Sequence, residues 1–524
     1  MSSESIKKIA ILGGGTAGWM TACYLDRQFN QAGQRAVDIT LIESDDVDII
    51  GVGESTFDSI RGYLQAVGVD ESEFMLNTDA SLKHGIYFKD WYRGDDEYFH
   101  PFEKVQIGDG VNMLHHWVNL HQREMNQHSI SEAVGVQYKA AMAAYSPKIS
   151  SNKDYEAPLP YSYHLDAVLM GRYLRQVSTA RGVKHIVAHA EHIELADDGR
   201  IQSIISREGE RYDADFFVDC TGFAQVLMRA LKNTDYVDYR SSLLCDRAVA
   251  AQVALPQEEG SGQYNPRPYT SAVAQESGWI WDIDLYRRRG CGYVYSSEFS
   301  DEARAEEVLF QYLGKQYSGK QCPNIEPRFL KMRIGRAEKF WHKNCVSIGL
   351  SGGFIEPLES TGIVFIDSGV RFLAELLGAD PCSKVLSDRY NSMMGSLYDE
   401  THNFIELHYI LSQRADSAFW RHYRDEVKPS SQLQERLALW REKIPSSIDF
   451  SDTLSTFWEN SHNFIMYGMN WKHSRMPANL QQLDSGRSIH MLSEMQKIQA
   501  KALPHFETHL ASLDRIRSRG KRVI

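Results

Sequence analysis

A glycine-rich turn near the start of the chain has the spacing of a dinucleotide-binding motif. Gly13, Gly15 and Gly18 form a Gly-x-Gly-x-x-Gly pattern directly after a short apolar run. In such a pattern the first glycine makes a tight turn, the second lets a pyrophosphate approach, and the third permits close packing of a helix on a strand. We expect the helix that begins at Thr16 and Ala17 to offer its backbone N–H groups to the phosphate.

An acidic residue completes this unit. A second apolar strand, Val37–Ile42, is followed by Glu43, which is placed to accept hydrogen bonds from ribose hydroxyl groups. The carboxylate favours an unphosphorylated ribose, and therefore FAD or NAD over NADP, but it does not separate FAD from NAD. A glycine-rich turn with a purely structural role is the alternative.

Two further strands are expected to return to the same ligand. The runs Phe216–Gly222 and Cys345–Leu350 are apolar, end in small residues and lie far along the chain from the first unit. A two-module flavoprotein needs such widely spaced strands, whereas an NAD-only domain closes sooner. We therefore expect Asp219, Gly349 and Leu350 to contact the cofactor.

The rest of the chain predicts an α/β fold with an interwoven helical part. From about residue 386 the pattern turns helical, most clearly at Tyr390–Leu411 and Gln432–Glu442, and no repeat or long linker divides the chain. We expect one interwoven unit. Its FAD module covers about residues 1–95 and 155–385, and its mainly helical substrate module covers about 96–154 and 386–524.

Composition excludes several classes of protein. A net charge of −12 and a pI near 5.9 argue against nucleic-acid binding. Seven scattered cysteines without a Cys-x-x-Cys pair indicate a reducing cytoplasm, and no apolar run reaches the length of about 18 residues that spans a membrane. His115, His116 and His121 lack the carboxylate or cysteine neighbours of a metal site, so we expect no metal.

Several motifs together resemble one enzyme family. The motifs are Gly51–Thr56, Ala80–Ile86, Trp279–Ile283, Phe354–Gly362, Phe404–Tyr409 and Arg414–Trp420. Their order along the chain resembles that of the flavin-dependent tryptophan halogenases, and the resemblance runs from Ile9 to about Trp458. It implies an FAD-binding module of the flavin monooxygenase type, in an enzyme that uses reduced FAD, dioxygen and chloride or bromide.

The resemblance assigns catalytic roles to three residues. Lys83 matches the family's catalytic lysine, which receives hypohalous acid through a tunnel and passes it to the substrate ring. An ammonium could donate a hydrogen bond to that oxidant, while a neutral amine could be N-halogenated, and the sequence does not choose between them. Glu359 matches a carboxylate that could bind the oxidant or accept the ring proton, and Ser360 matches a neighbouring serine that orients or relays. Without the resemblance, a solvated lysine and a salt-bridged acid would be the ordinary readings.

The resemblance also implies the binding residues for halide and flavin. Thr361 and Gly362 match the halide pair, where backbone N–H groups at a helix start can hold an anion, although a helix cap alone would also explain them. The flavin residues implied by the match are Gly53, Glu54, Ser55 and Thr56.

A pair of tryptophans is expected between flavin and substrate. Trp279 and Trp281 lie two residues apart, so on a strand they point to the same face. In the family they line the region between the two sites. This sequence departs from the family pattern at Asp284, where a proline normally stands, and that departure puts the shape of the wall in doubt.

The substrate is expected to be an electron-rich aromatic ring. His100, Phe102, Phe457 and Trp458 look like the family's aromatic sandwich for indole. Members that bind free tryptophan carry a Tyr-Tyr pair and a Glu that grip the amino-acid end, and the stretch Pro445–Thr453 lacks that pair. A buried zwitterion needs partners, so indole, a substituted indole or a tryptophan-containing peptide is favoured over free tryptophan.

Two other functions compete with halogenation. The main alternative is an FAD-dependent aromatic monooxygenase, and a non-enzymatic flavoprotein is the second. No second dinucleotide motif is found for NAD(P)H, and the resemblance implies a separate flavin reductase that supplies FADH2, and a homodimer.

Overall fold

The computed structural model describes most of the chain. It covers residues 6–30, 35–46, 53–108, 110–255, 264–316, 325–451 and 453–523. Gly51 and Val52 of the first family motif, Cys322 and Asp452 lie outside these ranges. The predicted α/β class is confirmed.

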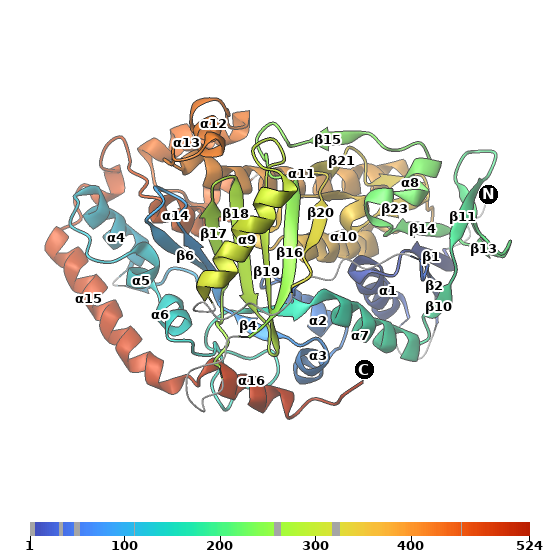
Figure 1. Ribbon diagram of the computed structural model, residues 1–524, viewed down its shortest axis with the longest axis horizontal. Coiled ribbons are helices and arrows are strands. Elements are labelled where there is room, and N and C mark those ends of the chain that lie inside the picture. Colours follow the sequence, from blue (N-terminus) through green and yellow to red (C-terminus); the bar gives the residue numbers. More distant parts are fainter. Residues whose placement is uncertain are drawn as a thin grey trace.

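The predicted strand–turn–helix–strand unit is confirmed at one end of the molecule (Figure 1). β1 (Lys8–Leu12) lies in a six-stranded sheet in which the first five strands are parallel and the last is antiparallel. Helix α1 (Thr16–Phe29) packs between α7 (Ala167–Ala180) and α10 (Gly362–Leu376). In sheet order the strands are β10 (Lys184–Val187), β2 (Asp38–Glu43), β1, β14 (Phe216–Asp219), β23 (Cys345–Ser347) and β22 (Trp341–His342).

A seven-stranded mixed sheet stands in the middle of the molecule, and α9 (Glu302–Gln316) lies across it (Figure 1). Apolar side chains of α9 and of the sheet form a core cluster of their own. In sheet order the strands are β20 (Arg328–Lys331), β16 (Arg247–Ala254), β19 (Arg288–Tyr295), β18 (Gly278–Asp284), β17 (Thr270–Gln275), β5 (Gly85–Lys89) and β6 (Glu97–Pro101).

A small sheet joins the two larger ones. β9 (Ser162–Asp166) is its central strand and pairs antiparallel with β3 (Gly53–Ser55) on one side and β4 (Ser81–Lys83) on the other. The remaining strands are β7 (Ile107–Gly108), β8 (Val111–Asn112), β11 (Ala190–Leu195), β12 (Ile201–Ser206), β13 (Arg211–Asp213), β15 (Tyr236–Asp238), β21 (Gly335–Ala337) and β24 (Gly353–Phe354).

Helices build the end of the molecule opposite the six-stranded sheet (Figure 1). The helix predicted at Tyr390–Leu411 is α11 (Lys384–Leu411), which begins six residues earlier than predicted. The helix predicted at Gln432–Glu442 is α13 (Ser431–Glu442). None of the helices in the described ranges has the length and apolarity needed to cross a bilayer. The others are α2 (Ile60–Ala66), α3 (Glu71–Asn77), α4 (Met113–Gln122), α5 (Ile130–Val134), α6 (Gln137–Met142), α8 (Val226–Ala230), α12 (Ala418–Asp425), α14 (Glu459–Gly468), α15 (Ser485–Ala502) and α16 (His509–Arg517).

Helix α16 supports the strand that carries Lys83. The Leu82 amide of β4 donates to Nε2 of His509 (3.0 Å), and Nδ1 of His509 contacts the Pro266 carbonyl oxygen (2.7 Å). The Arg517 guanidinium donates to the Met75 carbonyl (2.7 Å). The backbone of β4 is thus fixed from the side opposite to its sheet partner by a helix far along the chain.

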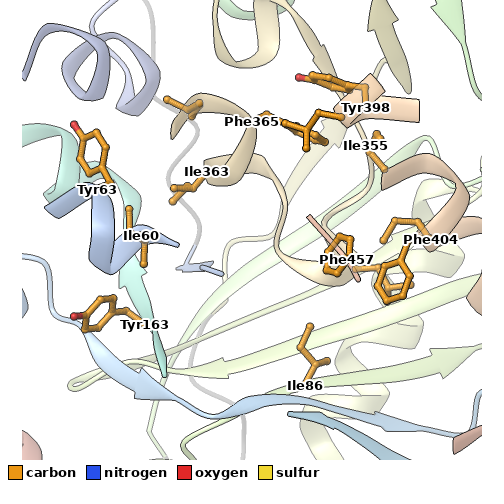
Figure 2. Packing of buried hydrophobic residues seen from close by; sticks show 14 of the residues in the cluster. Ile60, Tyr63, Ile86, Tyr163, Ile355, Ile363, Phe365, Tyr398, Phe404 and Phe457 are labelled. Atoms are coloured by element: carbon orange, nitrogen blue, oxygen red, sulfur yellow. The ribbon is translucent and has the colours of Figure 1, made fainter. Parts of the chain in front are cut away.

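One large hydrophobic cluster runs through both halves of the molecule. Figure 2 shows part of it, with Tyr63 of α2, Tyr163 of β9, Phe365 of α10 and Tyr398 of α11 all buried. Phe365 and Tyr398 stack with ring centroids 3.8 Å apart. Because these helices share one core, the side chains between them are held rigidly.

Candidate active site

The glycine-rich turn has the shape of a pyrophosphate cradle. A Cβ on Gly13 would lie 2.3 Å from the Cys220 carbonyl oxygen, and one on Gly18 would lie 1.9 Å from the Gly13 oxygen, so neither position admits a side chain. Gly15 instead faces open space, and a Cβ there would meet no atom within 4 Å. Helix α1 begins there with no side-chain cap and no acidic residue in its first turn. Its first N–H groups are therefore available to a phosphate, and the residues present fit a dinucleotide.

Other predicted cofactor residues lie around this cradle. Gly349, with a φ of +75°, approaches Ala17 so closely that a Cβ would lie 2.7 Å from the Ala17 Cβ, and Leu350 follows it in the same short 3-10 turn. Thr16 donates through its hydroxyl to the Ala167 carbonyl (3.3 Å). Glu43 lies at the end of β2 with His185 Nε2 2.6 Å from its carboxylate, so one of its oxygens already has a partner.

Asp219, which was predicted to contact the cofactor, has hydrogen-bond partners within the protein. Its side chain is fully buried, and its carboxylate accepts five hydrogen bonds. Two of them come from the first residues of α8, so the carboxylate caps that helix. The donors are the Thr221 amide and hydroxyl, the Ser351 hydroxyl, and the Leu227 and Met228 amides.

Lys83 is fully buried on β4, and its amine faces the aromatic ring of Phe102. Its Nζ donates to the Thr56 carbonyl (3.0 Å) and to the Ser360 hydroxyl (3.1 Å), and it lies 5.2 Å from the centroid of the Phe102 ring. Burial lowers the pKa of Lys83 to about 7, while the nearby carboxylates of Glu359 and Asp58 act in the opposite direction. Both forms of the amine are therefore accessible near neutral pH, which is unusual for lysine.

Two histidines hold the Glu359 carboxylate. Nδ1 of His100 lies 3.0 Å from both carboxylate oxygens, and Nε2 of His408 lies 3.1 Å from one of them. Burial alone would raise the pKa of Glu359, but His100 and His408 outweigh it and lower the pKa to about 2. Glu359 is thus a carboxylate at every working pH. His100 was predicted to be part of an aromatic sandwich, and in the structure it also contacts the Glu359 carboxylate.

The turn after Glu359 has the features of an anion site. Ser360 has a φ of +63°, a left-handed conformation that costs a residue with a side chain about 1–3 kcal/mol. The Thr361 hydroxyl is fully buried and, within the described ranges, makes no hydrogen bond. Gly362 begins the 15-residue helix α10, and a Cβ there would meet no atom within 4 Å. An unpaired buried donor beside a helix N-terminus and open space suits a small anion.

Aromatic rings pack against one another beside Lys83 and Glu359. Phe57, which was not predicted, packs edge-on against both Phe102 (5.5 Å) and Phe457 (5.4 Å). Phe404 and Phe457 stack with ring centroids 4.1 Å apart (Figure 2). Phe457 is fully buried, whereas its neighbour Trp458 is 44% exposed. Among the described ring contacts, Trp458 packs against Phe450 (centroids 6.1 Å apart) and not against Phe102, Phe404 or Phe457, so these contacts do not place it in the predicted sandwich.

The predicted same-face pair of tryptophans is confirmed. Trp279 and Trp281 lie on β18 with ring centroids 6.5 Å apart. Opposite Trp281 on β19 stands Gly292, where a Cβ would lie 2.0 Å from the indole ring. Glycine at that position makes room for the ring.

Asp284 belongs to a buried ion cluster at the far end of β18. Its carboxylate is bonded to Arg289 (2.7 Å), to Arg267 (3.1 Å) and to the Tyr264 hydroxyl (2.6 Å), and Arg267 also reaches Asp282 (2.6 Å). Burial alone would raise the pKa of Asp284, but the two arginines outweigh it and depress that pKa far below its usual value. A proline would leave both guanidinium groups to Asp282 alone. Asp284, the residue that departs from the family pattern, is thus paired with Arg267 and Arg289. It lies five residues after Trp279 in the sequence.

Replacing Asp284 by alanine is expected to destabilise the fold by about 3–5 kcal/mol, because it leaves buried cations without their counter-charge. Since the folded pKa is depressed, this stabilisation is fully present above about pH 4 and is lost only as the pH falls further. Calorimetric melting at pH 7 measures it. The matched control is Asp213→Ala, which breaks the exposed pair with Arg211 and should cost about 1 kcal/mol or less. Equal melting temperatures for the two variants would contradict the role given to Asp284.

In the stretch Pro445–Thr453, which lacks the family's gripping pair, the Asp449 carboxylate is already paired. The Asp449 carboxylate accepts from Lys443 (2.6 Å), from the Trp440 indole (3.0 Å) and from the Ser446 amide (3.0 Å). Burial alone would raise the pKa of Asp449, but these three contacts, with Lys443 first among them, outweigh it and lower that pKa. Asp449 is therefore not free to bind an ammonium group.

Sequence reasoning missed four residues that the structure brings to the site. His408 lies inside a motif that was noted, and a histidine on a buried face of a helix was the signal for it. Phe57, His164 and Thr270 carried no such signal, because their partners are distant in the sequence. Ser55 and Thr56, expected to contact flavin, also contact the lysine site through Ser360 and Lys83.

Comparisons with known proteins agree with this geometry. The family model described as tryptophan halogenase matches residues 8–484. A tryptophan 6-halogenase from Streptomyces toxytricini is 35% identical in an alignment of 468 positions that covers 85% of this chain and 86% of that protein.

Solved structures give the same result. The crystal structure of a tryptophan halogenase from Shewanella frigidimarina superposes with a TM-score of 0.91 at 32% identity and covers 100% of both chains. A flavin-dependent halogenase from Brevundimonas sp. superposes with a TM-score of 0.85 at 30% identity, over 97% of this chain and 99% of that one.

Proposed function

The chain belongs to the tryptophan halogenase family, and from this premise we propose that Lys83 delivers the oxidised halogen to an indole ring held against Phe102 and Phe457. The protein is a flavin-dependent halogenating enzyme that uses FADH2 and halide. The alternative of an aromatic monooxygenase was wrong: the comparisons support halogenation instead.

The observation that carries the proposal is the position of the Lys83 nitrogen. Two of its tetrahedral positions are occupied by bonds to the Thr56 carbonyl and the Ser360 hydroxyl. The third position is taken by Cε, so one N–H of the ammonium is left without a bond to Thr56 or Ser360. The Phe102 ring lies near this nitrogen, with its centroid 5.2 Å away. As an ammonium, Lys83 would donate a hydrogen bond to the oxygen of hypohalous acid and transfer that proton to it as the ring attacks the halogen, so that water leaves and Lys83 becomes a neutral amine.

Glu359 is proposed to accept the proton that the ring loses. Once carbon and halogen are bonded, the ring carbon bears both halogen and hydrogen, and removal of that proton restores aromaticity. A carboxylate that is ionised at all working pH values and is fixed by two histidines is a ready acceptor. His100 and His408 then offer routes by which the proton leaves Glu359.

Thr361 and Gly362 are proposed to hold the halide. The unpaired Thr361 hydroxyl and the N-terminus of α10 supply donors without a charged side chain, and the absence of a side chain at Gly362 leaves room for the ion.

The residues proposed to hold FAD form the cradle around α1 and the edge of β3. When bound in its reduced form, FAD would supply the two electrons that activate dioxygen, which then oxidises the halide. Gly53 and Glu54 on β3 extend the path from the cradle to Ser55 and Thr56 at the lysine site. The proposed set is Gly13, Gly15, Thr16, Ala17, Gly18, Glu43, Gly53, Glu54, Ser55, Thr56, Gly349 and Leu350.

Indole or an indole-containing peptide is proposed as the substrate in preference to free tryptophan. The observation that supports this proposal is that the Asp449 carboxylate is already paired with Lys443. Burying an amino-acid zwitterion without partners is costly because it carries two charges, whereas indole has only a single neutral N–H donor to satisfy.

We expect purified protein with FAD, a flavin reductase, NADH and bromide to monobrominate indole with a kcat/KM at least about tenfold above that for free tryptophan, since an unpaired buried charge costs more than about 1.4 kcal/mol. Mass spectrometry of products from indole, tryptophan and tryptophan peptides measures this. A preference for free tryptophan would contradict the substrate proposal alone. Oxygenated product without bromine would contradict halogenation itself.

The family implies a flavin reductase as the source of FADH2 and a tryptophan-like substrate. A homodimer and a cytoplasmic location stay predictions of the sequence. Size-exclusion chromatography with light scattering would test the first.

A further inference from the structure

The small sheet places three polar side chains in one row beside Lys83. His164 on the central strand β9 lies directly opposite Ser55 on β3 and opposite Ser81 on β4. Directly opposed residues of antiparallel strands project from the same face, and Lys83, two residues after Ser81, shares that face. The register of the sheet therefore aligns these side chains with the lysine.

Six successive hydrogen bonds lead from the lysine nitrogen across this row. They pass through four hydroxyl groups and one imidazole and end on a backbone carbonyl, and we refer to them as the hydroxyl–imidazole chain. The bonds join Lys83 Nζ to Ser360 Oγ (3.1 Å), Ser360 Oγ to Ser55 Oγ (2.9 Å), Ser55 Oγ to Thr270 Oγ1 (2.8 Å), Thr270 Oγ1 to His164 Nε2 (2.9 Å), His164 Nδ1 to Ser81 Oγ (3.4 Å) and Ser81 Oγ to the Asp284 carbonyl oxygen (2.5 Å).

The two ends fix the direction of the chain. A protonated Lys83 can donate but not accept, and the carbonyl of Asp284 can accept but not donate. Each hydroxyl between them therefore accepts on its Lys83 side and donates on its Asp284 side. His164 must then be neutral with its hydrogen on Nδ1, in agreement with a pKa that burial lowers well below its usual value.

We propose that Thr270 and His164 are positioning residues that keep Lys83 in its ammonium form, with its remaining N–H directed into the pocket. The inference rests on the function proposed for Lys83. A row of aligned hydrogen-bond dipoles that point away from the lysine stabilises a positive charge at its head, and such bonds strengthen one another in a medium of low dielectric constant. The chain thus opposes the burial that would otherwise remove the proton.

Other charged and titratable groups also act on Lys83. Glu359 and Asp58 are the carboxylates that act on it, and both favour the ammonium. Glu359 is itself engaged by His100 and His408, and Asp58 is influenced by Arg61 and Lys104. His164, if charged, would repel Lys83, and it is surrounded in turn by Asp284, His509 and Arg267.

The test is Thr270→Val, which keeps the shape of the side chain but interrupts the chain between Ser55 and His164. The pKa of Lys83 is measured by NMR with lysine labelled with ¹³C at Cε, and its signal is assigned by its loss in Lys83→Met. We expect the pKa to fall by about half a unit or more in Thr270→Val, and Thr270→Ser, which retains the hydroxyl, to restore it. The alkaline limb of the bromination rate should move to lower pH by the same amount.

An unchanged Lys83 pKa in folded Thr270→Val would overturn the inference, as would a fall in Thr270→Ser as large as that in the valine variant. A rate loss that is equal at every pH, with no shift of the limb, would show a merely structural effect. If Thr270→Val does not fold, Ser55→Ala interrupts the chain at its other side and is expected to give the same shift. Because the NMR titration needs neither flavin nor turnover, it stands even if the wild-type protein brominates no indole.

Discussion

Lys83→Met is expected to reduce bromination by at least about 10³-fold, because it removes the donor directed at the oxidant while it keeps most of the buried volume. Among the described residues, Lys83 is the cation that reaches the Phe102 side of the pocket. Product formation is measured by mass spectrometry at saturating FADH2 and bromide.

The matched control is Lys89→Met, on the neighbouring strand β5, where the side chain is exposed. That variant should retain the wild-type rate. FAD binding, followed by flavin fluorescence, should be unchanged in both variants, because the cradle around Gly15 does not involve Lys83. A Lys83→Met enzyme that still brominates within about tenfold of the wild type would remove the lysine from the mechanism.

Glu359→Gln is expected to reduce bromination by about 10²–10⁴-fold. Glutamine keeps the shape and can still meet His100 and His408, but an amide does not accept the ring proton. Since the pKa of Glu359 is lowered to about 2, its carboxylate stays ionised throughout the working range, and we expect no acid limb from it above about pH 3. The rate is measured from pH 5 to 9 with indole.

The control separates proton removal from formation of the oxidant. Glu375→Gln, an exposed change on α10, should leave the rate unaltered. A chemical trap for hypohalous acid should still be halogenated by Glu359→Gln in the absence of indole. If the trap reaction falls as far as indole bromination, Glu359 acts on the oxidant and not on the ring proton.

The parts of the fold that were predicted correctly are those with local signals. The apolar run, the glycine spacing and the acid after Val37–Ile42 determine β1, α1 and β2, and they all lie within about 35 residues of one another. The strand that places Trp279 and Trp281 on one face follows from the alternation of side chains alone. Such patterns need no knowledge of the partner element.

The site could be predicted only as a set of residues without contacts. Glu359 meets His100 across 259 positions and His408 across 49, and His164 meets Thr270 across 106. No local period encodes those distances. Asp284 shows the same limit: it was read as a disturbance of the tryptophan wall, and its explanation lies in Arg267 and Arg289, which the strand pattern does not reveal.

The support that α16 gives to β4 has a consequence for how the protein is made. Leu82 and His509 are 427 positions apart, so a ribosome that adds about 5–20 residues per second needs roughly 20 to 85 s between them. Throughout that interval the strand bearing Lys83 has emerged without the imidazole that its backbone pairs with. The strand that bears Lys83 therefore gains this backbone partner only after residue 509 has been made.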